Sequence, residues 1–140
     1  LEEKVQAGDI LTFGDRLLLF ELPFMGEPNM LLNVVFLMQT QGYRPVLAHP
    51  ERYTFYHRDL PKYERLKDRG VLFQVNIPSL SGRYGPAVKK AAETLIDRGW
   101  VELLGTDCHN LGHIEAIQDT LTEPYLHQVI ESGKLLNATL

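Results

Sequence analysis

The chain has 140 residues, of which 44% are hydrophobic and 23% are charged, the balance of an ordinary globular domain. Its 14 basic and 18 acidic residues give a net charge of -4, and no basic stripe alternates with aromatic residues, which argues against a nucleic-acid groove. The single cysteine excludes an intramolecular disulfide and fits a reducing compartment, and no segment has the length and apolarity to cross a bilayer. We therefore expect one cytoplasmic domain without membrane insertion, acting on a small or local ligand.

Apolar runs, helical periodicity and stop glycines predict strands and helices that alternate along the chain. In chain order the predicted elements are a strand at 17–21, a helix from 31 to Gly42, a strand at 45–48, a helix at 59–69, a strand at 71–76, a helix from Pro86 to Gly99 and a strand at 101–105. Residues 114–140 predict two further short helices, broken near Pro124 and Gly133.

The spacing of these elements predicts the fold class. The glycines that end the three helices, at 42, 70 and 99, are 28 and 29 residues apart, which is typical of βαβ units. Each strand is a mostly continuous apolar run, as in parallel sheets that are buried on both faces. The sequence therefore predicts an α/β protein with parallel strands.

Polar side chains stand at the carboxyl ends of all four predicted strands. Glu21 ends the first strand, His49 follows the second, Asn76 ends the third, and Asp107 with His109 follows the fourth. Because the active sites of parallel α/β folds form at this edge, we expect these side chains to converge. Side chains two apart in an extended chain leave on the same face, so Asp107 and His109 can hold one cation or bridge two. Carboxylate and imidazole ligands suit Mn, Zn or Fe better than Ca, so the pattern predicts a divalent metal site.

Structural interpretations of the same residues stay open on local sequence. Glu21 could be a solvated or ion-paired carboxylate, and His49 could be a capping histidine before Pro50. The pair at 107 and 109 could stabilise a loop as an Asx turn. The agreement of four separate strand ends favours the metal site.

A phosphate ligand is suggested by the arginine that follows His49. Arg52 lies three residues further on, close enough to reach the same edge, and arginine reads phosphate through its planar guanidinium. The alternatives for Arg52 are a surface salt bridge with Glu51 and stacking on Tyr53.

A second phosphate-binding candidate is the loop at 79–85, which contains Arg83 and runs into the helix that begins at Pro86. The amino ends of helices bind anions, and Arg83 would add a positive charge there. His113 is a further candidate for substrate binding because it lies near the D-x-H pair.

Other phosphate chemistries lack their motifs. A cysteine phosphatase needs a C-x5-R loop, but the position that would hold this arginine after Cys108 is Ile114. Neither G-x-x-x-x-G-K-[ST] nor G-x-G-x-x-G occurs, which argues against a P-loop and against a dinucleotide fold.

Five sequence stretches, in this order, resemble one family. They are Asp9-Ile-Leu-Thr12, Leu19-Phe-Glu-Leu-Pro-Phe24, the stretch from Gly42 to Tyr53 that contains His-Pro-Glu-Arg, Gln74-Val-Asn76 and Thr106-Asp-Cys-His-Asn110. Together they resemble the bacterial capsule-type tyrosine-protein phosphatases, the CpsB/CapC family of the polymerase and histidinol phosphatase (PHP) superfamily. The resemblance implies a distorted (β/α)7 barrel with a trinuclear site that prefers manganese. It also implies removal of phosphate from the tail of a partner tyrosine kinase, which regulates exopolysaccharide export.

By this resemblance four residues are metal ligands, namely Glu21, His49, Asp107 and His109. Arg52 corresponds to a catalytic arginine that contacts phosphate. The family's arginine after the D-x-H-N motif is absent here, where Leu111-Gly112-His113 stands instead, so either His113 takes part of its role or phosphate binding is weaker.

The family's amino-terminal H-x-H strand has no counterpart in residues 1–140, which therefore resemble only the carboxyl-terminal part of the barrel. We accordingly expect these residues alone to have negligible phosphatase activity. A small-molecule phosphatase of the histidinol-phosphate type and a non-catalytic metal-binding or docking module stay open as alternatives. A part of a barrel also leaves two strand edges with unpaired backbone groups, so we expect a homo-oligomer joined through such an edge or through an exchanged terminal segment, at 1–13 or 121–140.

Overall fold

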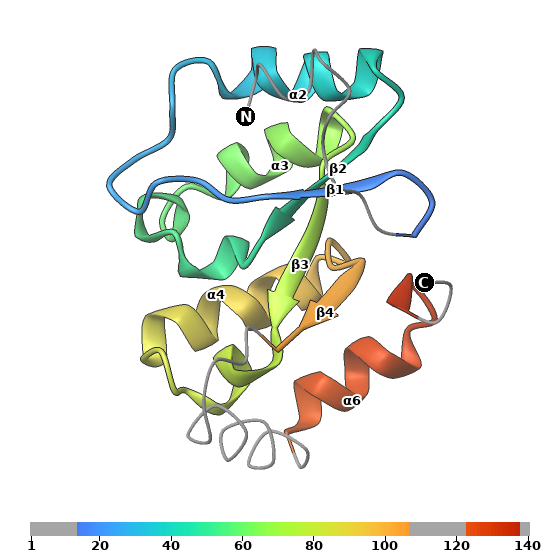
Figure 1. Cartoon of the computed structure of the whole chain (residues 1–140). Helices are drawn as coiled ribbons and strands as arrows, with labels where there is room; N and C mark the ends of the chain where they lie inside the picture. Colours follow the sequence, from blue (N-terminus) through green and yellow to red (C-terminus); the bar gives the residue numbers. More distant parts are fainter. Residues whose placement is uncertain (1–13, 107–122, 138–140) are drawn as a thin grey trace.

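A computed structural model of the chain describes residues 14–106 and 123–137 (Figure 1). Strands and α-helices alternate along these ranges, in the order β1 (Leu17–Phe20), α2 (Leu31–Thr40), β2 (Arg44–Ala48), α3 (Leu60–Asp68), β3 (Leu72–Asn76), α4 (Pro86–Asp97), β4 (Leu103–Gly105) and α6 (Pro124–Glu131). Short 3-10 helices lie in the loops, and these are η1 (Pro50–Arg52), η2 (Thr54–Tyr56) and η3 (Ile77–Ser81). No helix within the described ranges is long and apolar enough to span a membrane.

The predicted alternation of strands and helices is confirmed, with differences of one or two residues at the ends of elements. β1 ends at Phe20, so that Glu21 lies just beyond the strand, and β4 begins at Leu103. Of the two short helices predicted after residue 114, the structure describes α6. It begins at Pro124, whose missing N–H suits the first turn of a helix, and the segment 107–122 lies outside the described residues.

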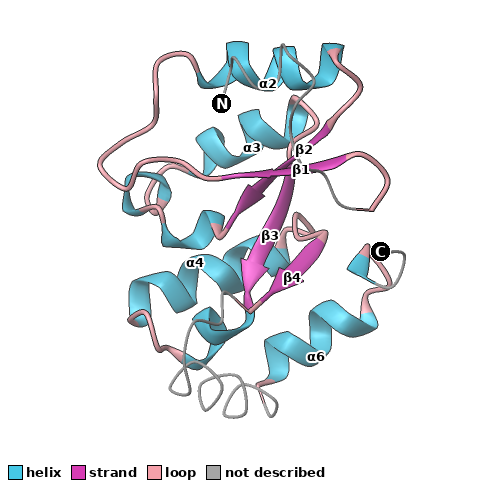
Figure 2. Cartoon of the chain, viewed as in Figure 1, coloured by secondary structure: helices cyan, strands magenta, loops and turns pink. Residues whose placement is uncertain are grey.

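The strands form one parallel sheet in the order β1-β2-β3-β4, and each strand is connected to the next through a helix (Figure 2). The predicted α/β class and parallel pairing are therefore confirmed. Because every pair of neighbouring strands is parallel, the carboxyl ends of all four strands lie along one edge of the sheet.

The two faces of this sheet are covered unequally. One face turns Leu47 and Phe73 into the main core, which the helices fill with residues such as Leu95. The other face carries a smaller cluster of Leu17, Val46 and Leu103, and Leu19 on β1 is 41% exposed. The prediction that the strands are buried on both faces is thus confirmed for the residues of these two clusters. It is wrong for Leu19, where the apolar run of β1 is exposed to solvent.

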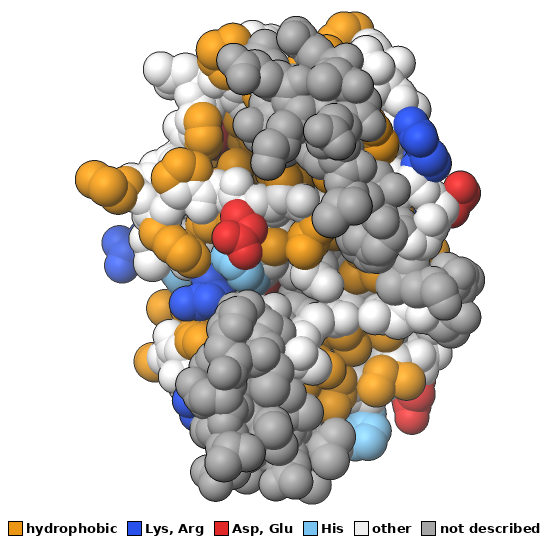
Figure 3. All heavy atoms as spheres, in the orientation of Figure 1, with side chains coloured by type: hydrophobic (Ala, Val, Ile, Leu, Met, Phe, Trp, Pro, Cys, Tyr) orange, Lys and Arg blue, Asp and Glu red, His pale blue; other side chains and the backbone are white. Residues whose placement is uncertain are grey.

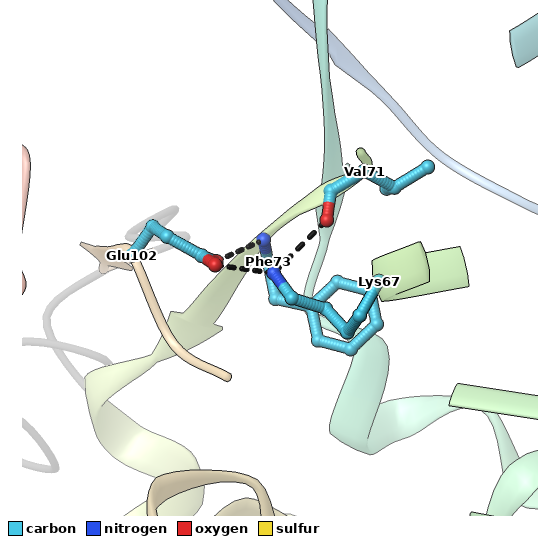
Figure 4. A network of polar contacts seen from close by, with 4 residues as sticks. All are labelled: Lys67, Val71, Phe73 and Glu102. Carbon is cyan, nitrogen blue, oxygen red and sulfur yellow. Dashed lines mark hydrogen bonds and ion pairs between the residues drawn. The ribbon is translucent and has the colours of Figure 1, made fainter. Parts of the chain in front are cut away.

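A partly buried ion pair lies at the amino-terminal edge of the sheet (Figure 4). Glu102 pairs with Lys67, and its other oxygen accepts a hydrogen bond of 2.8 Å from the backbone N–H of Phe73. Lys67 also donates to the carbonyl of Val71 over 2.9 Å, and burial lowers the pKa of its ammonium group. These contacts fasten β3 to the chain entering β4, at the opposite edge from the predicted site.

The free side of β4 is covered by the chain that follows α6. The Asn137 side chain accepts from the Leu104 N–H over 2.8 Å and donates to the Leu104 carbonyl over 3.0 Å. The Leu136 N–H donates to the Glu102 carbonyl over 2.7 Å. The expectation of an unpaired strand edge is therefore wrong for this part of β4, because a polar side chain and a following segment imitate a neighbouring strand.

Candidate metal and phosphate site

A cavity of about 280 Å³ lies at the carboxyl edge of the sheet, where residues from all four strand ends meet. Its lining consists of Leu19, Glu21, Ala48, His49, Gln74, Asn76, Gly105 and Thr106. Figure 3 shows carboxylate, imidazole and basic side chains gathered on this face of the molecule, beside hydrophobic ones. The predicted convergence of Glu21, His49 and Asn76 is therefore confirmed.

Two ionisable side chains of the cavity, from the residues that follow β1 and β2, lie close together. Nε2 of His49 lies 3.4 Å from Oε1 of Glu21, with the imidazole almost buried and the Glu21 side chain 65% exposed. Two ligands of one transition metal ion, each about 2.0–2.2 Å from it, are about 3.0–3.4 Å apart at octahedral to tetrahedral angles. This pair therefore fits two positions on a single divalent cation.

His49 has an unusual backbone for a residue before proline. Its φ of 37° and ψ of 57° are left-handed, although a following proline normally holds the preceding residue in an extended conformation. Its N–H donates to the carbonyl of Gln74 over 2.7 Å, and this bond fixes the turn against β3. Such strain persists only where surrounding contacts impose it, and it gathers at functional sites.

The capping interpretation of His49 is not supported by its side chain. His49 is the N-cap residue of η1, but its imidazole makes no capping hydrogen bond. Nδ1 is buried without a hydrogen-bond partner among the described residues, while Nε2 faces Glu21. The ring is held by aromatic packing on Phe24 and Tyr53, at centroid distances of 5.7 and 5.4 Å. The arrangement leaves Nε2 turned toward the Glu21 carboxylate, in a position where a metal ion could bind both groups.

Arg52 lies over two aromatic rings. Its guanidinium carbon is 5.3 Å from the ring centre of Phe24 and 4.2 Å from that of Tyr84. The predicted stacking on Tyr53 is thus replaced by stacking on these two rings. Cation–π contacts of this kind restrain the long side chain, and a guanidinium is a group that binds phosphate through its N–H donors.

Glu51 is a residue of this turn that the sequence did not single out for a role of its own. It is fully buried, and Oε1 accepts hydrogen bonds from the Asn76 N–H over 2.9 Å and from the Ser79 hydroxyl over 2.8 Å. Burial raises the pKa of the Glu51 carboxyl to about 7. The proposed surface salt bridge with Arg52 is therefore wrong, since the carboxylate turns inward and ties η1 to the end of β3.

The loop after β1 is held by a second buried contact. The Leu22 N–H donates to the Tyr53 hydroxyl over 2.8 Å, and the Tyr53 side chain is fully buried. Burial raises the pKa of this phenol to about 12, so it stays protonated. The contact connects the residue after Glu21 to the residue after Arg52 and thereby fixes the two halves of the candidate site relative to each other.

The other predicted site residues do not join this cavity. Arg83 is exposed and does not line it, while Ser79 of the same loop is buried against Glu51. Asp107, His109 and His113 lie outside the described residues, although Thr106 at the cavity directly precedes the first of them. Within the described ranges, no three His, Cys, Asp or Glu side chains gather closely enough to hold a metal ion.

Two carboxamide side chains line the cavity, of which the sequence analysis predicted only one. Asn76, predicted at the rim, lines the cavity and is 2% exposed. Gln74 also lines it and lies against Gly105, where an added Cβ would come within 2.8 Å of the Gln74 side chain. Their positions two residues apart on β3 were a signal for this, because alternate residues of a strand share a face.

The chain is similar in sequence to two curated proteins. The chain is 27% identical over 112 residues to the tyrosine-protein phosphatase YwqE of Bacillus subtilis (strain 168), a match covering 79% of this chain and 44% of YwqE. It is 31% identical over 96 residues to the putative tyrosine-protein phosphatase CapC of Staphylococcus aureus, covering 69% of this chain and 38% of CapC.

A solved structure is similar in three dimensions. It comes from a crystallographic description of YwqE from Bacillus subtilis and CpsB from Streptococcus pneumoniae as unique metal-dependent tyrosine phosphatases. The TM-score is 0.78 at 25% sequence identity, covering 95% of this chain and 52% of that chain. The chain thus spans about half the length of the relatives it matches, or less. Because the family described as "Capsular polysaccharide synthesis, CpsB/CapC" matches residues 1–125, the chain belongs to the CpsB/CapC family.

Proposed function

We propose that the cavity at the carboxyl edge is part of the active site of a metal-dependent protein-tyrosine phosphatase. The observation that carries this proposal is the 3.4 Å separation of His49 Nε2 and Glu21 Oε1, with Arg52 on the next turn of the chain. A metal ion supplies charge stabilisation and an activated water to phosphoryl transfer, and an arginine stabilises charge on the phosphoryl oxygens, so a ligand pair beside a restrained arginine suits phosphate monoester hydrolysis.

His49 and Glu21 would hold a divalent cation together with Asp107 and His109, which follow the cavity residue Thr106 in the sequence. Imidazole with carboxylate oxygens fits manganese, and zinc or iron would fit the same donors. A cation held here supplies Lewis-acid stabilisation of phosphoryl oxygens and an acidified water.

The chain's own residues bind and orient the substrate. Arg52 would donate to the phosphoryl oxygens as charge develops on them, and its position over Phe24 and Tyr84 limits the reorganisation that this requires. The leaving phenolate of tyrosine has a pKa of about 10, so it departs more readily than an alkoxide. Arg83 and His113 are proposed as outer contacts for the protein substrate.

The strand order supports a barrel for the complete domain. Parallel strands in unbroken sequential order are the arrangement of a (β/α) barrel, and the partly exposed face that carries Leu19 would become the barrel interior. We propose that residues 1–140 are the carboxyl-terminal part of such a distorted (β/α)7 barrel. Its cytoplasmic substrate would be the phosphorylated tail of a tyrosine kinase that controls capsular polysaccharide synthesis.

A non-catalytic metal-binding or docking module is the second candidate. It is favoured by the absence of a group of three metal ligands within the described ranges. Hydrolysis of a phosphotyrosine peptide, histidinol phosphate and p-nitrophenyl phosphate, measured with added Mn²⁺, separates the possibilities. The assay uses the protein expressed with every residue that its gene encodes. We expect this protein to hydrolyse the phosphotyrosine peptide faster than the other two substrates. Preference for histidinol phosphate would make it a small-molecule phosphatase, and manganese binding without turnover would support the module.

A further inference from the structure

Phe24 is a half-exposed aromatic ring that is fixed among the residues of the candidate site. Its ring lies parallel to the imidazole of His49, with an interplanar angle of 10° and a centroid distance of 5.7 Å. It also packs on Tyr53 at 5.4 Å, and the guanidinium of Arg52 lies 5.3 Å from its centre. Despite these contacts, 52% of Phe24 remains exposed.

The position of Phe24 is set by buried structure, so its exposed half is a fixed feature of the surface. Tyr53 beneath it is fully buried, and the hydroxyl of Tyr53 accepts a hydrogen bond from the Leu22 N–H two residues before Phe24. The next residue, Met25, is 99% exposed, so the apolar packing in this loop is made by Phe24 and not by its neighbour. Phe24 thus combines a restrained position beside His49 and Arg52 with an uncovered part.

We propose that the exposed half of Phe24 contacts the aromatic ring of the substrate and makes the site selective for aryl phosphates. The inference rests on the proposed phosphatase function. In an aryl phosphate the ring is joined to phosphorus through one oxygen. When Arg52 and the ligand pair hold the phosphoryl group, the substrate ring therefore lies close to the residues around Arg52, and Phe24 is one of them. Aromatic rings attract each other in offset or edge-to-face arrangements at centroid distances of about 4.5–7 Å, and an alkyl phosphate cannot make this contact.

The test compares two inhibitors that cannot be hydrolysed. Phenylphosphonate carries the ring and methylphosphonate does not, and their dissociation constants are measured by calorimetry with Mn²⁺ on the protein expressed with every residue its gene encodes. For Phe24→Ala we expect phenylphosphonate to bind roughly 3- to 10-fold more weakly, with methylphosphonate unchanged. Phe24→Leu, which keeps apolar volume and protects folding, should show the same selective loss, and Phe24→Tyr should restore binding.

Met25→Ala is the matched control, since it removes the adjacent exposed side chain and should change neither constant. Equal weakening of both phosphonates in Phe24→Leu would overturn the inference, because Phe24 would then support His49 or Arg52 instead of the substrate ring. Unchanged phenylphosphonate binding would overturn it too. Failure of the proposed function is seen separately, as absence of phosphotyrosine hydrolysis in a protein that still prefers phenylphosphonate.

Discussion

The Ser79 hydroxyl lies 2.8 Å from Oε1 of Glu51 and donates a hydrogen bond to it. The carboxyl group that precedes Arg52 in sequence therefore binds a buried partner and does not face solvent. The Asn76 N–H donates to the same oxygen over 2.9 Å. One buried carboxyl group therefore joins the turn that carries His49 and Arg52 to the end of β3. The cost of burying that group makes the stability of the turn depend on pH.

The first prediction concerns this pH dependence. Burial raises the pKa of Glu51 from 4.5 to about 7, so the folded protein holds the proton more tightly than the unfolded chain. The resulting stabilisation is fully present below about pH 4.5 and is lost as the pH rises through 7. Glu51→Gln keeps an acceptor oxygen and does not titrate. Between these pH values the wild type should lose about 3 kcal/mol of unfolding free energy relative to Glu51→Gln, measured by urea unfolding with EDTA present. Parallel stability curves for the two proteins would contradict this.

A second prediction concerns the left-handed backbone of His49, whose φ is 37°. Glycine adopts this conformation without the steric cost that a Cβ brings, so His49→Gly should be more stable than His49→Ala by about 1 kcal/mol in metal-free buffer. His57 has an ordinary right-handed φ of -61° and is the control. There the order should reverse, with His57→Gly less stable than His57→Ala. The same order at both positions would show that no strain is stored at residue 49.

The third prediction separates metal binding from phosphate binding. His49→Ala removes a ligand and should lower both metal content and activity. Arg52→Ala should keep the metal and lose about 2–4 kcal/mol of transition-state stabilisation, the range for one charge-stabilising donor. Arg58→Ala, an exposed arginine further along the same loop, should behave as the wild type. Metal content is read by mass spectrometry, and loss of metal from Arg52→Ala would assign Arg52 a structural role.

A fourth prediction tests the packing of the cavity wall. A Cβ on Gly105 would meet Cδ and Nε2 of Gln74 at 2.8 Å, and both atoms belong to the end of a flexible side chain. Gly105→Ala should therefore cost about 1–2 kcal/mol as Gln74 is pushed aside. In a Gln74→Ala background the same substitution should cost much less. A thermal-melt double-mutant cycle measures the coupling, and additive effects would mean that the two residues do not touch.

The strand ends and the polar residues that follow them could be predicted from the sequence because local signals determine them. Apolar runs and stop glycines fix where β1 and β2 end, and Glu21 and His49 follow directly. The inward orientation of Glu51 could not be predicted, because its partners Asn76 and Ser79 are 25 and 28 residues away in the chain. Sequence neighbours instead suggested a pair with Arg52. Only the packing of η1 against β3 and η3 decides between a surface carboxylate and a buried one.

The partner of the β4 edge also lies far away in the sequence, and it could not be predicted for this reason. The sequence predicted unpaired backbone groups at this edge, whereas in the structure Asn137 binds them. Both hydrogen-bonding groups of the Leu104 backbone are satisfied by its carboxamide, at 2.8 and 3.0 Å across 33 residues of chain. No local pattern marks an asparagine as a substitute for a strand, since its role depends on where the segment after α6 returns to the sheet.

The final prediction concerns association through that edge. Asn137→Ala removes both contacts to Leu104 and leaves a backbone donor and acceptor free at the end of the sheet. We expect a loss of about 1–2 kcal/mol in stability and a higher average mass by light scattering at low micromolar concentration, because free strand edges recruit strands from other copies. Asn137→Asp keeps an acceptor for the Leu104 N–H but loses the donor, and should be intermediate in stability. Glu131→Ala, an exposed residue at the end of α6, is the control. If Asn137→Ala is destabilised without any rise in mass, the homo-oligomer expected from the sequence does not form through β4, and the exposed side of β1 at Leu19 becomes the edge to test next.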